Sequence, residues 1–335
     1  MSLNIGIIGF GYWGPHLARN FNLNKECAVA RIADLDQKRR KEASENYPRC
    51  LVSSDSRDIT EANDIDIVAI ATPVFSHFDL AMSALDNGKH VWIEKPIASS
   101  SEEAMRIVEK AESKNLIVII DHTFLFTSAV IKMKEIIDEG LLGKLHYYDS
   151  VRANLGLFQH DVNVIWDLTT HDLAVIGYLL GKEPQTVGAV GSSHFNSFID
   201  IGYVTLHYEN DFIAHFHANW LSPLKIRKSM ISGDRNMLVW DENEREEKIK
   251  IYNKGVNIVS HGAPNTGFAD YRVGEVHSPL IMNTEALKTE VEYFVSCLSS
   301  GVNPHNNAIA GYNVMKILEA TDKSLKLNGS PVELK

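Results

Sequence analysis

Two side chains, Asp167 and His171, stand four residues apart and form a pattern that could move a proton. If residues 165–180 form a helix, this spacing places both side chains on one face, one turn from each other. A carboxylate beside an imidazole fixes the tautomer of the ring and raises its basicity. Ordinary surface pairs on helices show the same spacing. The catalytic interpretation is favoured by Lys95 at the end of a predicted strand, whose ammonium could hydrogen-bond a substrate hydroxyl.

A glycine-rich turn near the N-terminus could hold the phosphates of a dinucleotide. Gly9, Gly11 and Gly14 follow a short apolar run that starts at Leu3, and a helix-like stretch comes after them. In Gly-x-Gly-x-x-Gly, the first glycine permits a tight turn and the second lets backbone amides approach a pyrophosphate. The third lets the helix pack close to the strand. The helix N-terminus adds amide donors and the positive end of a dipole.

A single acid, Asp34, indicates which dinucleotide would bind. It ends the second predicted strand, about twenty residues after the last glycine of the motif. A carboxylate at this position accepts hydrogen bonds from ribose hydroxyls and repels a 2′-phosphate. The sequence therefore favours NAD over NADP.

The first third of the chain alternates predicted strands with predicted helices, which is typical of a doubly wound parallel sheet. The glycine motif, Asp34 and Lys95 all follow predicted strands, as do Thr72-Pro73 and Asp121-His122. Ligands on such sheets bind beyond the carboxyl ends of the strands. We therefore expect an α/β Rossmann domain over residues 1–123.

The pattern changes after residue 123. Helical segments alternate first with a strand and then with a run of segments that read as mainly antiparallel strands, before two closing helices. We expect an α+β domain with an open sheet over residues 124–335, whose last helix could pack back on the first domain. An open sheet with an apolar face invites self-association, so a homodimer or homotetramer formed through this sheet is expected.

These motifs together resemble the Gfo/Idh/MocA oxidoreductases. The resemblance rests on the glycine motif, on Ala71-Thr72-Pro73 with His77, on Glu94-Lys95-Pro96, and on the Asp-x-x-x-His segment at 167–171. It implies an NAD-dependent dehydrogenase with Lys95, Asp167 and His171 as catalytic residues. The residues implied in cofactor binding are Gly9, Phe10, Gly11, Tyr12, Trp13, Gly14, Asp34, Thr72, Pro73, His77, Glu94, Lys95 and His122.

The implied reaction is hydride transfer from a secondary alcohol of a sugar ring to nicotinamide. Either His171 or Lys95 could take the hydroxyl proton. We prefer His171 as the base, with Asp167 orienting the ring and Lys95 polarising the oxygen.

The segment from Arg152 to Asp167 resembles nucleotide-sugar 3-dehydrogenases, which suggests C3 of a UDP-N-acetylhexosamine or its uronate as the site of oxidation. Candidate substrate contacts are Lys95, Arg152, Asn154, Asp167 and His171, with Asp161 and Asn163 in a following loop. An acidic protein that binds an anionic sugar nucleotide needs a local cation, and Arg152 could supply it. The alternatives are a myo-inositol or free-sugar dehydrogenase, a redox-assisted elimination or hydrolysis, and a non-catalytic sugar sensor that holds NAD.

Composition excludes several other classes of protein. The 335 residues carry a formal net charge of −10, which disfavours nucleic-acid binding. No apolar stretch is long enough to span a membrane, and the first residues lack the pattern of a signal peptide. Three cysteines suggest reduced thiols in a cytoplasm. His215 and His217 share a strand face without a clear third ligand, so no metal site is expected.

Overall fold

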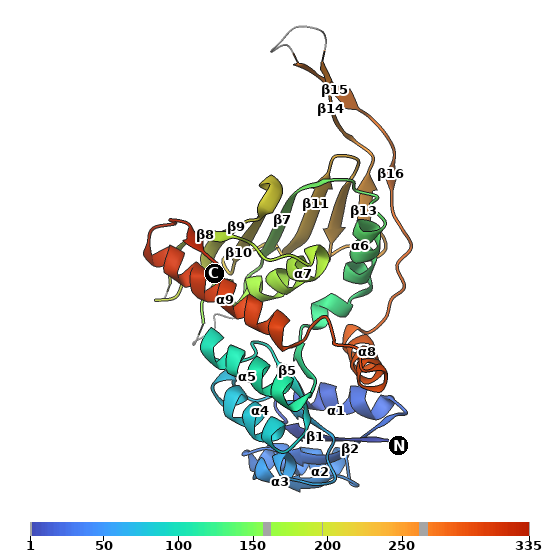
Figure 1. The fold of residues 1–335 in the computed structure, drawn as a ribbon, viewed down its shortest axis with the longest axis vertical. Coiled ribbons are helices and arrows are strands. Elements are labelled where there is room, and N and C mark those ends of the chain that lie inside the picture. Colours follow the sequence, from blue (N-terminus) through green and yellow to red (C-terminus); the bar gives the residue numbers. More distant parts are fainter. Residues whose placement is uncertain (1, 157–161, 196, 261–266, 335) are drawn as a thin grey trace. The chain divides into compact units, whose positions relative to one another are not determined.

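The computed structural model describes residues 2–156, 162–195, 197–260 and 267–334 (Figure 1). The chain forms two compact units, which are described separately below. Unit 1 contains Met1–Thr127 and Thr284–Lys316, and unit 2 contains Ser128–Asn283 and Ile317–Lys335. The sequence suggested one boundary after residue 123. In the structure, the segment Thr284–Lys316 belongs with the N-terminal part of the chain.

Unit 1 is built on a six-stranded parallel sheet in the order β3-β2-β1-β4-β5-β6. The order reverses beside β1, as in doubly wound folds, so the predicted Rossmann fold is confirmed. The strands are β1 Leu3–Ile8, β2 Cys27–Ala33, β3 Leu51–Ser53, β4 Ile67–Ile70, β5 His90–Glu94 and β6 Val118–Asp121. The helices are α1 Gly14–Leu23, α2 Gln37–Asn46, α3 Arg57–Thr60, α4 His77–Asp86, α5 Ser101–Lys114, α8 Ala286–Ser300 and the start of α9 Ala308–Lys326, with 3-10 turns at Val74–Ser76 and Thr123–Phe126.

The core of unit 1 includes a helix from the far end of the sequence. Trp92 in β5 is fully buried between Phe21 of α1 and Phe294 of α8, with ring centroids 5.4 and 5.7 Å away. Figure 1 shows α8 in orange next to α1. Edge-to-face rings at these distances pack favourably and bury a large apolar area. Helix α8 is therefore part of the core of the nucleotide-binding fold.

Unit 2 contains a nine-stranded sheet in the order β16-β13-β12-β11-β7-β10-β9-β8-β17. Neighbours are antiparallel except for β7 and β10, which confirms the expected open and mainly antiparallel sheet. The strands are β7 Leu145–Ala153, β8 Thr186–Ser192, β9 Ile201–His207, β10 Ile213–Asn219, β11 Ile226–Gly233, β12 Met237–Asp241, β13 Ile249–Tyr252, β16 Val276–His277 and β17 Val332–Glu333. A separate hairpin, β14 Gly255–Ser260 with β15 Gly267–Arg272, extends from this sheet as a long arm (Figure 1).

The helical segments of unit 2 carry the candidate catalytic residues Asp167 and His171. They are α6 Ser128–Asp138, a π-helical turn Ile165–Thr169, α7 Thr170–Leu180 and a 3-10 turn Glu209–Asp211. A Cβ on Gly202 would lie 2.6 Å from the Ile165 side chain, so this glycine lets the π-turn pack directly on β9. Within the described ranges, no helix combines the length and apolar character that crossing a membrane requires.

Candidate active site

The glycine-rich turn between β1 and α1 leaves room for a phosphate-bearing ligand. Gly9 has a φ of +92°, which glycine adopts without steric cost. A Cβ on Gly14 would lie 2.2 Å from the carbonyl oxygen of Gly9, so glycine is required for α1 to start this close to β1. Apart from its chain neighbours, no described atom lies within 4 Å of the Cβ position at Gly11. The backbone is open there, which fits a pyrophosphate approaching its amides.

Asp34 follows β2 and is fixed by two backbone donors. The N–H of Phe10 donates to Oδ2 over 2.6 Å, and the N–H of Asp36 donates to Oδ1 over 2.7 Å. The ring of Phe10 is fully buried, so this residue offers its backbone rather than its side chain to the site. The fixed carboxylate borders a cavity of ≈ 680 Å³ within unit 1, which Gly9 and Thr72 also line.

Three carboxylates line this cavity, and two nearby cations, Arg40 and Arg57, are occupied. Asp36 and Asp55 line it together with Asp34. Arg57 pairs with Asp55 over 2.6 Å, and Arg40 donates to the backbone carbonyl of Asp34 over 2.9 Å. A 2′-phosphate would meet negative charge here, whereas ribose hydroxyls would meet acceptors. The cavity therefore fits NAD better than NADP.

His77 connects two of the turns implied in cofactor binding. Its Nδ1 lies 2.8 Å from the carbonyl oxygen of Pro96, and its Nε2 lies 2.8 Å from the carbonyl oxygen of Thr72. The ring is buried. Burial lowers the pKa of His77, and the two carbonyl contacts only partly oppose this shift. Since both ring nitrogens contact the backbone, His77 holds the Thr72 and Pro96 turns together.

Three carboxyl groups meet in unit 1 next to Lys95 in the chain. Glu94 and Asp121 are register partners at the ends of β5 and β6, and Glu290 reaches Asp121 from α8. The Asp121 carboxyl lies beside both glutamate carboxyls. Asp121 and Glu290 are buried. Burial and neighbouring carboxyl groups both disfavour the ionised form of an acid.

Neutral donors complete the carboxyl cluster formed by Glu94, Asp121 and Glu290. Thr123 Oγ1 donates to Asp121 Oδ1 over 2.5 Å, and Trp92 Nε1 donates to Oδ2 over 3.4 Å. The Asn306 amide, from the segment before α9, donates to Glu290 Oε1 over 2.9 Å. Burial raises the pKa of all three carboxyls, most clearly those of the two glutamates.

His122 directly follows Asp121 and is one of the residues that the family resemblance implies in cofactor binding. It is buried, and in the described part of the chain neither ring nitrogen has a hydrogen-bond partner. Burial and the nearby Lys95 ammonium lower its pKa to about 3, so the ring is neutral at pH 7. A neutral imidazole has one N–H group that needs an acceptor and one unprotonated nitrogen that needs a donor. Both partners are missing among the described residues. A bound molecule at the strand ends would supply them.

Asp167 and His171 lie on either side of a junction between two kinds of helix in unit 2. Asp167 is in the π-helical turn, and His171 is in the first turn of α7. The expectation of one regular helix over residues 165–180 is therefore wrong for the first turn, because that turn bonds with i→i+5 spacing and is wider. Oδ2 of Asp167 accepts a hydrogen bond from Nε1 of Trp220 over 3.1 Å, so this carboxylate is anchored from the sheet.

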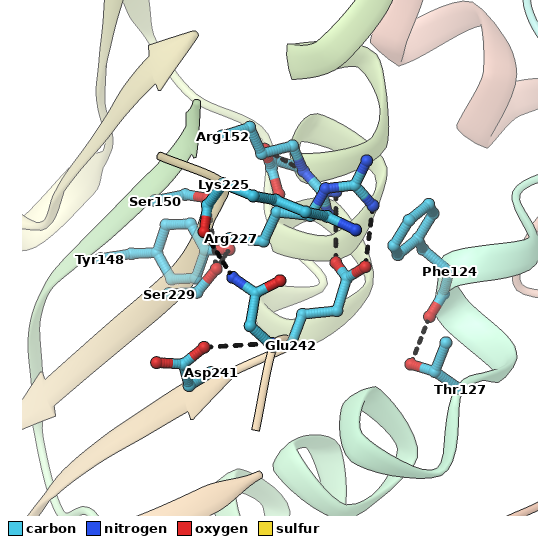
Figure 2. A network of polar contacts seen from close by, with 12 residues as sticks. Phe124, Thr127, Tyr148, Ser150, Arg152, Lys225, Arg227, Ser229, Asp241 and Glu242 are labelled. Carbon is cyan, nitrogen blue, oxygen red and sulfur yellow. Dashed lines mark hydrogen bonds and ion pairs between the residues drawn. The ribbon is translucent and has the colours of Figure 1, made fainter. Parts of the chain in front are cut away.

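Arg152 lies inside an ion-pair network of unit 2 (Figure 2). Its side chain is 4% exposed, and its Nε donates to Asp172 Oδ2 over 2.8 Å. Its second partner is Glu242 at 3.4 Å, which also accepts from Arg227 at 2.8 Å. Two carboxylates already balance the guanidinium, whereas the sequence suggested a cation available to an anionic substrate. We assign Arg152 to the packing of β7 against α7.

Asn154 follows β7 and presents a polar group without a partner. Its N–H donates to the Asn219 carbonyl over 3.0 Å, while its Oδ1 is buried and unbonded within the described residues. A sugar hydroxyl is the kind of donor that would satisfy this oxygen.

Tyr12 is exposed and stacks edge-on against Trp13 before α1. Asp161 lies outside the described residues.

The sequence placed Asp121 at a strand end but did not predict its carboxyl neighbours, and it did not predict Glu290 or Trp220 as parts of these sites. A signal existed for Glu290, because it interrupts the apolar stripe of α8 formed by Val291 and Phe294. Trp220 and Asp167 are 53 residues apart, and no local pattern connects them. Among the described residues, no group of three or more His, Cys, Asp or Glu side chains could hold a metal ion.

Two family models match this chain, one over residues 3–122 and one over residues 130–239. Residues 3–122 match the model described as "Oxidoreductase family, NAD-binding Rossmann fold", and residues 130–239 match the "GFO/IDH/MocA C-terminal domain". The chain belongs to the Gfo/Idh/MocA family of NAD-binding oxidoreductases. The family resemblance, the enzyme class and the NAD cofactor expected from the sequence are confirmed.

Relatives of known activity act on sugars and cyclic polyols. UDP-N-acetylglucosamine 3-dehydrogenase of Acidithiobacillus ferrooxidans is 27% identical over 317 residues, which cover 93% of this chain and 94% of that protein. The NAD-dependent scyllo-inositol 2-dehydrogenase of Bacillus subtilis is 25% identical over 295 residues, which cover 84% and 81%. A levoglucosan dehydrogenase solved with NADH and levoglucosan shares the fold, with a TM-score of 0.84, 21% identity and full coverage of both chains.

Proposed function

We propose that this oxidoreductase oxidises a secondary alcohol of a sugar ring, with C3 of a UDP-N-acetylhexosamine or its uronate as the preferred substrate position. NAD, when bound, supplies the hydride acceptor. The observation that carries the proposal is the carboxylate of Asp167, which accepts a hydrogen bond from Trp220 in the π-helical turn before α7 and precedes His171 by four residues.

Each catalytic residue has one task in this proposal. His171 accepts the hydroxyl proton, and Asp167 stabilises the resulting imidazolium and orients the ring. Lys95, which directly follows β5, is assigned to stabilise the charge that develops on the substrate oxygen. Asn154 Oδ1 and the ring nitrogens of His122 remain as buried polar atoms that a sugar and a cofactor would satisfy.

The nucleotide-sugar assignment is supported by the extent of the likeness to UDP-N-acetylglucosamine 3-dehydrogenase, which spans 93% of this chain. A second candidate, an uncharged polyol such as myo-inositol or a free sugar, is favoured by a different observation. Arg152, the cation suggested for an anionic substrate, is buried and paired with two carboxylates.

The three cysteines are free thiols, which is consistent with a reaction in the cytoplasm.

A substrate panel tests the proposal. The purified protein is incubated with NAD and, separately, with UDP-N-acetylglucosamine, its uronate, myo-inositol and glucose, and NADH is followed by its absorbance. We expect NADH with a nucleotide sugar. NADH with myo-inositol or glucose alone would establish the second candidate. NAD binding without turnover would support a sensor, unless sugar is converted without net NADH, which product analysis would reveal as redox-assisted elimination or hydrolysis.

Replacing the proposed base separates catalysis from cofactor binding. His171→Asn should lower turnover by about 100-fold or more, since positioned acid–base catalysis contributes 10²–10⁴-fold. The affinity for NAD should change less than about twofold, because the glycine turn and Asp34 belong to unit 1. His207→Asn, at an exposed position at the end of β9, is the matched control and should retain full turnover. Full turnover by His171→Asn would contradict the assignment of the base.

A further inference from the structure

We propose that Trp220 is the positioning residue for Asp167. This inference rests on the proposed catalytic role of Asp167. The indole Nε1 of Trp220 donates to Oδ2 of Asp167 over 3.1 Å, and the ring itself is 1% exposed. A donor on one carboxylate oxygen fixes the rotation of the whole group, so the direction of the second oxygen is fixed as well.

Trp220 is held rigidly enough to act as a fixed donor. It directly follows β10, its N–H donates to the Asp200 carbonyl over 3.0 Å, and its carbonyl accepts from the N–H of Gly156 over 3.2 Å. A Cβ on Gly156 would come within 2.8 Å of the indole ring, so the backbone of this glycine lies directly against the ring. The protein's own backbone therefore holds the donor in one position, which is the arrangement that catalytic preorganisation requires.

The local helix geometry explains why Asp167 needs an anchor from outside its own segment. Asp167 sits in the π-helical turn Ile165–Thr169, where the i,i+4 alignment of a regular α-helix with His171 does not apply. The carboxylate is instead oriented by a residue 53 positions away on the sheet. Trp220 acts through Asp167 and not on the substrate.

Unit 2 contains a matched control for this role. Trp240 in β12 belongs to the same sheet as β10 and is 3% exposed. Its Nε1 is buried and has no hydrogen-bond partner in the described part of the chain. Trp220→Phe and Trp240→Phe each remove a buried indole and leave a similar void, but only the first removes a bond to Asp167. A purely structural effect would be similar in both variants.

Steady-state kinetics on the substrate found by the panel provide the first test. Trp220→Phe should lower kcat by roughly 10- to 100-fold, as expected for the loss of a hydrogen bond to a charged group. The KM for NAD should remain within about twofold. In an Asp167→Ala background, Trp220→Phe should lower kcat less than about twofold further. Equal losses from Trp220→Phe and Trp240→Phe, or full additivity with Asp167→Ala, would overturn the proposal.

The indole resonances provide a second test that needs no turnover. The ¹H–¹⁵N spectrum of the NAD-bound protein should show one cross-peak for each of the five tryptophans, assigned by the Trp→Phe variants. Asp167→Ala should move the Trp220 cross-peak upfield and speed its exchange with solvent, while the Trp240 cross-peak stays in place. An unmoved Trp220 cross-peak would overturn the proposal even in an active enzyme. A moved cross-peak in a protein that turns over no sugar would retain the contact and reject only the proposed function.

Discussion

The buried carboxyl cluster of unit 1, formed by Glu94, Asp121 and Glu290, disfavours the ionised form of its members. Asp121 accepts from Thr123 and Trp92, which favours its charged form and opposes the effect of burial. Glu94 and Glu290 each face the Asp121 carboxyl, and burial together with this neighbour raises their pKa well above the usual range. The Lys95 ammonium lies near enough to lower the pKa of Glu94 and only partly opposes this shift.

Glu290 should make the protein less stable as the pH rises. Its pKa is raised in the folded protein, so folding takes up a proton between the pKa of the unfolded chain, near 4.5, and the raised value. Stability is then lost with increasing pH across that window, at about 1.4 kcal/mol per pH unit. Glu290→Gln keeps an oxygen for Asn306 and an N–H for Asp121. Its melting temperature relative to wild type should rise from pH 5 to pH 8.

Thermal melts of both proteins across this pH range check the prediction. Glu292→Gln, on an exposed position of the same helix, is the control, and its difference from wild type should not change with pH. A Glu290→Gln protein that loses stability relative to wild type at pH 8 would show that Glu290 is ionised in the fold.

At the scale of elements, the longer strands of unit 2 could be predicted from the sequence, whereas the π-helical turn and the two-residue strands could not. Runs of alternating apolar residues predicted the mainly antiparallel strands of unit 2, because one face of the sheet is buried and the other is not. The π-turn before α7 could not be predicted, because local sequence does not distinguish it from an α-helical turn. The two-residue strands β16 and β17 depend on long-range pairing and carry no periodicity of their own.

The open face of the nine-stranded sheet is the element expected to mediate self-association. It carries Tyr203, Ile213 and Ile226, which are exposed large side chains on neighbouring strands, with Val151 on the central strand β7. Light scattering of the wild-type protein should give two or four times the chain mass of 37.5 kDa. Val151→Glu would place a charge in such an interface and should shift the mass towards that of one chain.

The control for this experiment is Val302→Glu, which changes a valine that is 56% exposed in unit 1 and should leave the mass unchanged. A wild-type mass of one chain, or a Val151→Glu protein that keeps the wild-type mass, would contradict association through this face.

For the molecule as a whole, the sequence predicted the two fold classes but not the path of the chain between them. The boundary near residue 123 marks a real change of pattern, yet Thr284–Lys316 returns to unit 1. An apolar stripe on a helix shows that this face of the helix must be buried, but it does not show which surface covers it. The glycine turn and Asp34 were expected directly after two strands, and the structure places them after β1 and β2, because these positions have local backbone reasons. The contacts of Asp121, Glu290 and Trp220 were not expected, because they form only in the folded chain.

This division predicts which fragment can fold. Residues 1–127 alone lack Phe294 and the rest of α8, which cover Trp92. We expect this fragment to unfold without a cooperative transition in circular dichroism. A fusion of 1–127 to 284–316 through a flexible linker of about ten residues should unfold cooperatively and bind NAD. Phe294→Ala in the fusion should abolish most of this gain. Equal cooperativity of the fragment and the fusion would contradict the role of α8.

The return of α8 also sets the order of events during synthesis. When Thr127 leaves the ribosome, the buried face of Trp92 still has no cover, because Ser128–Asn283 must be made before α8 follows. These 156 residues take roughly 8–30 s at about 5–20 residues per second. For that interval the nascent nucleotide-binding fold exposes an apolar surface that chaperones can bind. Most of unit 1 thus emerges before Ser128–Asn283 but can be completed only after that segment has been translated.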